Sequence, residues 1–105
     1  MRTLEFRADA QLLQKDPTCD FTNIAPGSSG YLTAHFNFSA REWQGCVKAA
    51  SFWYNGKEYA TLLKNDACVI PADALVGRKF EVSVSGARAG GYRITSTRTT
   101  VKQEG

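Results

Sequence analysis

Apolar residues recur at every second position in several short runs of this chain, and no run keeps helical spacing for three turns. In residues 31–39, four apolar side chains share one face: Leu32, Ala34, Phe36 and Phe38. Residues 79–85 alternate in the same way, with one face formed by Phe80, Val82 and Val84. Because successive side chains of a strand point to opposite faces, this period predicts half-buried strands and argues against a helical protein.

Turn-forming residues divide the chain into seven to eight expected strands. They cover residues 3–8, 11–14, 31–39, 47–54, 58–63, 67–70, 79–85 and 93–101. The pattern predicts an all-β chain that forms one domain over residues 1–105, a single antiparallel β-sandwich of immunoglobulin-like type. A closed barrel is the alternative architecture.

The turns themselves have recognisable signals. Asn55-Gly56 favours a tight hairpin turn, and one extra residue at Lys57 would add a bulge. Pro71 should stop a strand and begin one helical turn over residues 72–75.

A second helical turn is expected just before Trp43. Ser39 and Glu42 have the spacing of a capping box, in which each side chain satisfies a backbone N–H of the other residue. We expect this turn to place Trp43 as a lid over one end of the core.

Irregular structure is expected in three places. Residues 23–30 carry one proline, two glycines and two serines, so they should form the longest loop and a mobile or contact surface. In the last strand, Ile94 and Val101 fall on opposite faces, which predicts a bulge or a change of sheet near Thr95. Residues 103–105 are expected to be a frayed tail.

The composition is that of an ordinary soluble domain, with 43% hydrophobic and 22% charged residues. The net charge of +3 is small and the basic residues are scattered, so no nucleic-acid partner is expected. The N-terminus lacks the apolar run of a signal peptide, and no stretch predicts a membrane span or a membrane partner. We therefore expect a protein made in a bacterial cytoplasm.

Nothing in the sequence predicts a reaction centre. An odd number of cysteines cannot all pair within one chain, which favours free thiols at Cys19, Cys46 and Cys68. These residues lie far apart and the acidic residues are scattered, so no metal and no cofactor is expected. The one base for a hydrolase is His35, which would need a neighbouring nucleophile such as Cys46. We expect no enzymatic activity.

Aromatic residues around the hairpin turn are the main candidates for a binding surface. Trp53, Tyr54 and Tyr59 could form a platform on which sugar rings stack, or they could pack as cross-strand neighbours. Together with Ser28 and Ser29 of the long loop, they are the expected contact residues for a partner protein or a glycan.

The second half of the chain carries an ordered series of strand and corner signals. The series begins with Phe38-Ser39, Glu42-Trp43, Gly45, Ala50, Phe52 and Tyr59. It continues with Cys68-Val69-Ile70-Pro71, Leu75 and Phe80-Glu81-Val82-Ser83-Val84-Ser85-Gly86, and closes with Tyr92-Arg93-Ile94-Thr95-Ser96-Thr97 and Val101-Lys102-Gln103-Glu104-Gly105. In this order the signals resemble a small β-sandwich domain found in virion and tail proteins of phages and prophages of Gram-positive bacteria.

This resemblance implies a non-enzymatic structural module of the virion, associated with a tail, baseplate or fibre. Its partners would be other virion proteins, and it would form a homo-oligomer in the particle. The contact surfaces are expected at residues 3–8, taken as an edge strand, and at the loop 23–30. Two alternatives stay open: an adhesion module for glycans of the host cell wall, and a head decoration protein.

Overall fold

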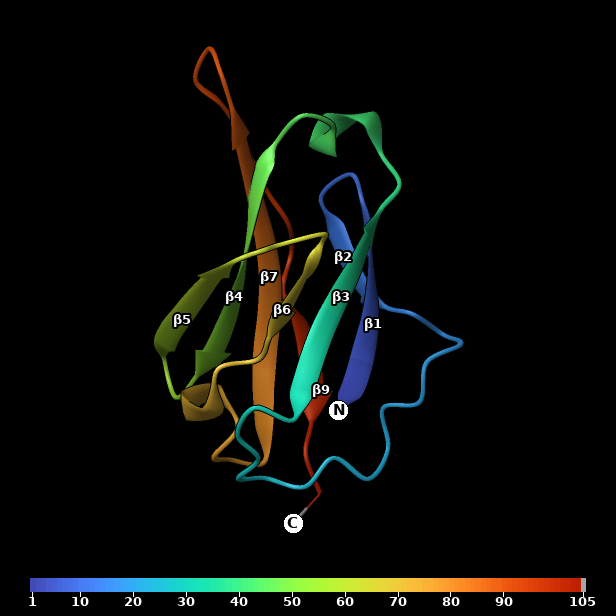
Figure 1. Ribbon diagram of the computed structural model, residues 1–105, viewed down its shortest axis with the longest axis vertical. Coiled ribbons are helices and arrows are strands. Elements are labelled where there is room, and N and C mark those ends of the chain that lie inside the picture. Colours follow the sequence, from blue (N-terminus) through green and yellow to red (C-terminus); the bar gives the residue numbers. More distant parts are fainter. Residues whose placement is uncertain (105) are drawn as a thin grey trace.

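The computed structural model describes residues 1–104 and shows an all-β chain whose strands form two sheets packed together (Figure 1). The strands are β1 (Arg2–Asp9), β2 (Leu12–Lys15), β3 (Leu32–Phe38), β4 (Val47–Tyr54), β5 (Lys57–Leu62), β6 (Ala67–Val69), β7 (Lys79–Arg88), β8 (Tyr92–Thr95) and β9 (Thr99–Lys102). Two short 3-10 turns are η1 (Arg41–Trp43) and η2 (Ala72–Ala74). The all-β class is confirmed, and two separate sheets replace the closed barrel that the pattern left open.

One pair of strands runs parallel. The four-stranded sheet has the order β2-β1-β3-β6, and β1 and β3 align from Arg2↔Leu32 to Ala8↔Phe38. The prediction of a purely antiparallel sandwich is therefore wrong. The hairpin of β1 and β2 returns the chain to the end where β1 began, so β3 starts from that end along the other edge of β1. The finer immunoglobulin-like topology stays a prediction.

The position of β1 also corrects the expected contact surface. β3 pairs with β1 from Arg2 to Ala8, and β2 pairs with the other edge from Phe6 to Asp9. Before that, the Glu5 carbonyl on this second edge accepts the N–H of Asp16. Residues 3–8 therefore do not form the exposed edge strand that we expected.

The five-stranded sheet contains one strand more than the sequence pattern suggested at the C-terminal end. Its order is β5-β4-β7-β8, and β9 follows β8 along the same edge of β7. Between them, the Ser96 hydroxyl accepts a hydrogen bond from the backbone N–H of Val84. The predicted interruption of the last strand near Thr95 is confirmed. It allows both Ile94 and Val101 to be buried.

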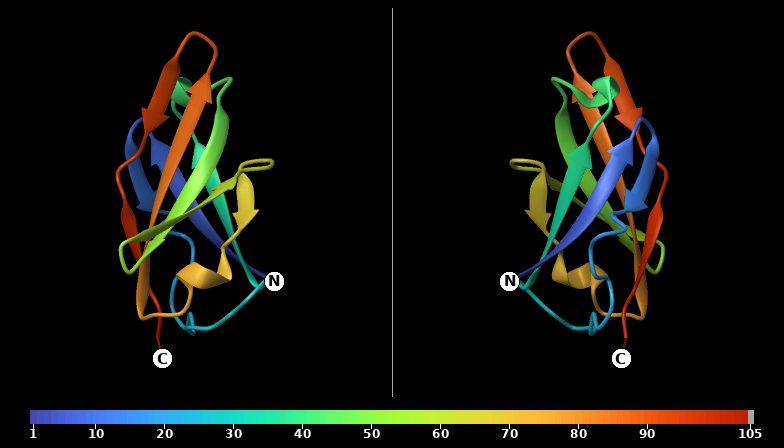
Figure 2. Two further views of the ribbon diagram at one scale, coloured as in Figure 1. Left: turned by 90° about the vertical axis from the view of Figure 1, so that its left-hand side faces the viewer. Right: turned by 90° about the vertical axis from the view of Figure 1, so that its right-hand side faces the viewer.

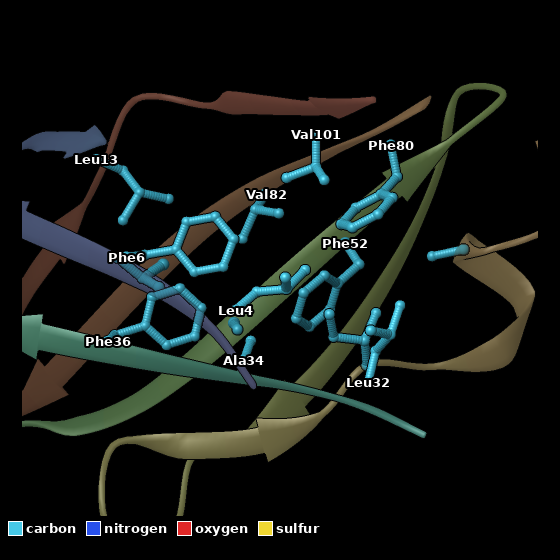
Figure 3. Close-up of a cluster of buried hydrophobic side chains, with 14 of the residues drawn as sticks. Leu4, Phe6, Leu13, Leu32, Ala34, Phe36, Phe52, Phe80, Val82 and Val101 are labelled. Carbon is cyan, nitrogen blue, oxygen red and sulfur yellow. The ribbon is translucent and has the colours of Figure 1, made fainter. Parts of the chain in front are cut away.

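A hydrophobic core fills the space between the sheets (Figure 3). Figure 3 shows inward-pointing side chains from both sheets, among them Phe6, Phe36, Phe52, Phe80, Leu4, Ala34, Val82 and Val101. Phe6 and Phe36 are direct neighbours across the parallel pair, and their rings stack with centroids 5.2 Å apart. The buried face of each of these strands is the apolar face that the alternation predicted.

Trp43 covers one end of this core, as predicted, although the turn that carries it is held differently. The Trp43 side chain is only 1% exposed, and its indole N–H donates to the Ala10 carbonyl at 2.7 Å. The N-cap of η1 is Ala40, and no side chain caps the turn, so the capping box of Ser39 and Glu42 is not formed. Burial of the indole, and not a side-chain cap, therefore positions Trp43 over the core.

The hairpin between β4 and β5 has the tight turn that its sequence predicts. Asn55 and Gly56 have φ values of 53° and 78°, a conformation that glycine and asparagine tolerate best. Tyr54 pairs directly with Lys57, which leaves a two-residue loop. The expected bulge at Lys57 is absent because the turn closes without an extra residue.

The long connection between β2 and β3 is held by backbone contacts. The Arg2 guanidinium donates to the carbonyls of Asp20, Thr22 and Asn23 at 2.6–3.1 Å. Farther along, the N–H of Gly27 donates to Leu75 at 2.8 Å. The segment is therefore pinned to both β1 and the region of η2.

Two carboxylates organise the first part of this connection. Asp16 accepts hydrogen bonds from the backbone N–H and hydroxyl of Thr18, and Asp20 accepts the same pair from Thr22. These hydrogen bonds favour the charged form and lower the pKa of both carboxyls below their ordinary value. The repeated Asp-x-Thr pattern thus replaces regular structure with two side-chain turns.

The C-terminal tail is part of the fold up to the last described residue. Gln103 is buried and its amide donates to the Gly77 carbonyl at 2.9 Å. The backbone N–H of Glu104 donates to the carbonyl of buried Ile24 at 2.7 Å. The prediction of a frayed tail is therefore wrong for residues 103–104, and Gly105 lies outside the described residues.

Candidate functional site

The structure separates the three aromatic residues expected to form a sugar-stacking platform. Trp53 pairs with Glu58 and Glu81 on the outer face of the five-stranded sheet, whereas Tyr54 and Tyr59 pack against the core. The exposed side of Trp53 is also covered, because the Arg98 guanidinium lies 3.6 Å from the centre of its ring. The three rings therefore do not share one surface.

The remaining predicted contact residues lie elsewhere. Ser28 and Ser29 belong to the long connection, next to the anchored Gly27, and not to the β4–β5 hairpin. Tyr54 has its ring against Gly77, where an added β-carbon would overlap it. The structure thus brings none of the predicted residues into a common site with Trp53.

The groups that could take part in nucleophilic chemistry are also separated. His35 Nδ1 lies 2.7 Å from Glu5 Oε1, as a pair across β1 and β3 on the outer face of the four-stranded sheet. Cys46 packs against the core instead, and its sulfur lies 3.7 Å from the Glu42 carbonyl. Within residues 1–104, no three His, Cys, Asp or Glu side chains are grouped to hold a metal ion.

All three cysteines are free and partly buried, as their odd number predicted. Cys68 pairs with Ala34 at the inner side of β6, and burial raises the pKa of its thiol to about 12. The thiolate is the reactive form of cysteine, so burial suppresses the reactivity of this side chain.

We expect Cys68 to be the last of the three cysteines to react with iodoacetamide in the folded protein at pH 8. Peptide mass spectrometry over a time course would measure the order of labelling. In guanidinium chloride, where burial is lost, all three should react at similar rates. Preferential labelling of Cys68 in the folded protein would contradict the protected environment described above.

The most prominent unoccupied edge belongs to β5, which pairs only with β4 and forms the left-hand border of the molecule in Figure 1. The opposite side of the sandwich is closed, since Thr97 donates to the Gln11 carbonyl and accepts from the N–H of Leu13. β6, a border strand of the four-stranded sheet, has only three residues, whereas β5 has six. Figure 2 shows these borders from two sides.

The direction of the free backbone groups follows from one hydrogen bond. The N–H of Leu63 donates to the Lys48 carbonyl of β4 at 2.9 Å. Because backbone groups of an antiparallel strand alternate in direction, Glu58, Ala60 and Leu62 point their N–H and C=O groups away from β4. A partner strand could satisfy these groups.

An apolar hollow lies beside this edge on the outer face of the five-stranded sheet. Leu62 and Val47 are 70% and 69% exposed, and Ala49, which pairs with Leu62, lies between them. The hollow has a volume of about 200 Å³. Its lining consists of these three residues with Lys48, Ser85, Gly86, Ala87 and Arg93, so two charged residues also border it. A single apolar side chain of a partner would fit there.

Sequence reasoning missed this surface, although a signal was available. The register that turns Phe52 inward places Val47 and Ala49 outward, on a face where polar residues are expected. A single exposed apolar residue is common and says little about function. Two large ones on neighbouring strands indicate a contact surface. Their proximity could not be seen before the strand register was known.

No protein family model, curated protein or solved structure matches this chain. Among residues 1–104, no helix has the length and apolar character needed to cross a membrane.

Proposed function

We propose that this chain is a non-enzymatic structural module of a phage particle, an immunoglobulin-like β-sandwich that assembles with other virion proteins. The free edge of β5 beside the apolar hollow is the observation that carries the assembly role. The ordered signals from Phe36 onward, which resemble domains of virion and tail proteins, support the place of the module in a tail, baseplate or fibre.

The proposed mode of contact is addition of a partner strand to β5. Backbone hydrogen bonds to Ala60 and Leu62 would supply affinity, and a side chain in the hollow would supply specificity. The charged residues of β5 stand at its start, as Lys57 and Glu58, so residues 59–62 lack the charges that usually protect an edge strand.

Leu62→Glu is expected to weaken binding of the partner at least about tenfold, because it places a charge in the apolar contact. Ala60→Pro should have a similar effect by removing an N–H that points away from β4. The measurement is light scattering of the purified chain, alone and mixed with each protein encoded beside its gene.

The matched control is Leu12→Glu, which adds the same charge at a half-exposed leucine of the other sheet and should leave association unchanged. Equal weakening by Leu12→Glu would point to a general charge effect and contradict the proposed surface. A chain that stays monomeric at millimolar concentration and binds none of these proteins would overturn the assembly role.

A further inference from the structure

Two unpaired arginines lie at the end of the sandwich where η1, the β1–β2 turn and the β7–β8 hairpin meet (Figure 1). Arg41 lies in η1, and Arg88 ends β7. Among the residues that the structure describes, neither of the two is within salt-bridge distance of a carboxylate; the ion pairs there are His35–Glu5, Lys48–Asp66 and Arg98–Glu81. This end therefore presents positive charge that the fold does not neutralise.

Both arginines line one hollow. Its volume is about 710 Å³, and its lining residues are Arg41, Glu42, Gln44, Arg88 and Tyr92. We call it the Tyr92 groove.

Tyr92 fixes the arginine at the centre of this groove. The Arg88 guanidinium lies 3.8 Å from the centre of the Tyr92 ring and donates to the Gln44 carbonyl at 2.7 Å. The Tyr92 hydroxyl in turn donates to the Glu42 carbonyl at 2.9 Å. A guanidinium held on both sides loses less freedom when it binds an anion, and its remaining N–H groups match a carboxylate or phosphate.

Glu42 restricts the chemistry of the ligand. A carboxylate in the same lining repels a ligand that is only anionic, but it accepts hydrogen bonds from hydroxyl groups. Neither face of the Tyr92 ring is free for stacking, since Arg88 covers one side and the ring packs against the core. A single-stranded nucleic acid would lack the aromatic platform that it normally uses.

We propose that the Tyr92 groove binds an acidic polysaccharide, with its anionic groups on Arg88 and Arg41 and its hydroxyls on Glu42. Charged groups that recur along a polysaccharide chain would engage both arginines at once. The site is distinct from the β5 edge, and it does not depend on the virion role proposed above.

The test is calorimetric titration of the full chain with a hexasaccharide of galacturonic acid, with maltohexaose as the neutral match. The acidic sugar should bind at least about tenfold more tightly, and added salt should weaken it. Arg88→Gln and Arg41→Gln should each reduce its affinity several-fold. The matched control is Arg98→Gln, since Arg98 lies over Trp53 on another surface, and it should leave binding unchanged.

Glu42→Ala separates the two roles of the carboxylate. It should weaken binding of the acidic hexasaccharide while strengthening binding of inorganic phosphate, which has no sugar hydroxyls. Thermal melting would verify that each variant is folded, and Arg41→Gln is the safer of the two arginine variants because Arg88 also holds Gln44. Equal affinity for the acidic and neutral sugars, stronger binding of an oligonucleotide, or tighter sugar binding by Glu42→Ala would each overturn the proposal.

Discussion

Replacement of Trp43 by alanine is expected to lower the free energy of unfolding by about 3–5 kcal/mol, the usual loss for a large buried aromatic side chain. The indole is almost fully buried, lies with its ring 4.9 Å from Phe38, and donates to the Ala10 carbonyl. A β-carbon at Gly86 would lie only 3.2 Å from the indole, so this glycine gives the ring its room. Truncation would therefore leave a cavity and an unpaired carbonyl.

Urea denaturation would measure this loss, and thermal melting should show a fall of about 12–40 °C, since each kcal/mol corresponds to about 4–8 °C in a domain of this size. Trp53→Ala is the matched control, because Trp53 lies on the outer face under Arg98. It should cost less than half as much. A comparable loss in the two variants would show that Trp43 is not the lid described above.

Ile24→Ala is expected to lower the free energy of unfolding by about 2–4 kcal/mol, an effect unusual for a residue in a long irregular connection. The Ile24 side chain is 2% exposed and belongs to the core cluster. Its carbonyl also accepts the N–H of Glu104 at 2.7 Å. The loss should therefore extend to the C-terminal tail, where the Glu104 amide should exchange faster with solvent.

The matched control for this variant is Leu62→Ala, which removes a similar amount of aliphatic side chain at a site that is 70% exposed. It should change the free energy of unfolding by less than about 0.5 kcal/mol. Urea denaturation and hydrogen exchange would compare the two. If Ile24→Ala is as mild as Leu62→Ala, the connection is not anchored as we describe.

Local features of this protein were predictable because they depend on neighbouring residues. The alternation around Phe36 and Val82 identified both the strands and their buried faces. Asn55-Gly56 identified its turn because few other residue pairs accept two positive φ values in succession. The expectation for Trp43 was also right, since a large apolar residue after a strand has few places to go except the core.

Two local predictions failed, the capping box at Ser39 and the bulge at Lys57. Others failed because a distant segment supplies the contact. The tail was expected to fray because Gln103 and Glu104 look like a polar terminus, yet Gly77 and Ile24 receive their hydrogen bonds. The aromatic platform at Trp53 was plausible from its position beside the turn. Arg98, from the segment between β8 and β9, covers that ring in the folded chain.

The sequence by itself determined the all-β class, most of the strands and the apolar face that each turns inward, because side-chain period and turn chemistry act over a few residues. Only the tertiary structure decided that β1 lies parallel to β3 in the interior of a sheet, that β5 keeps a free edge, and that two arginines line one hollow with Tyr92. These features depend on which strands become neighbours. That choice is made by the shared burial of side chains far apart in the chain, which no local pattern records.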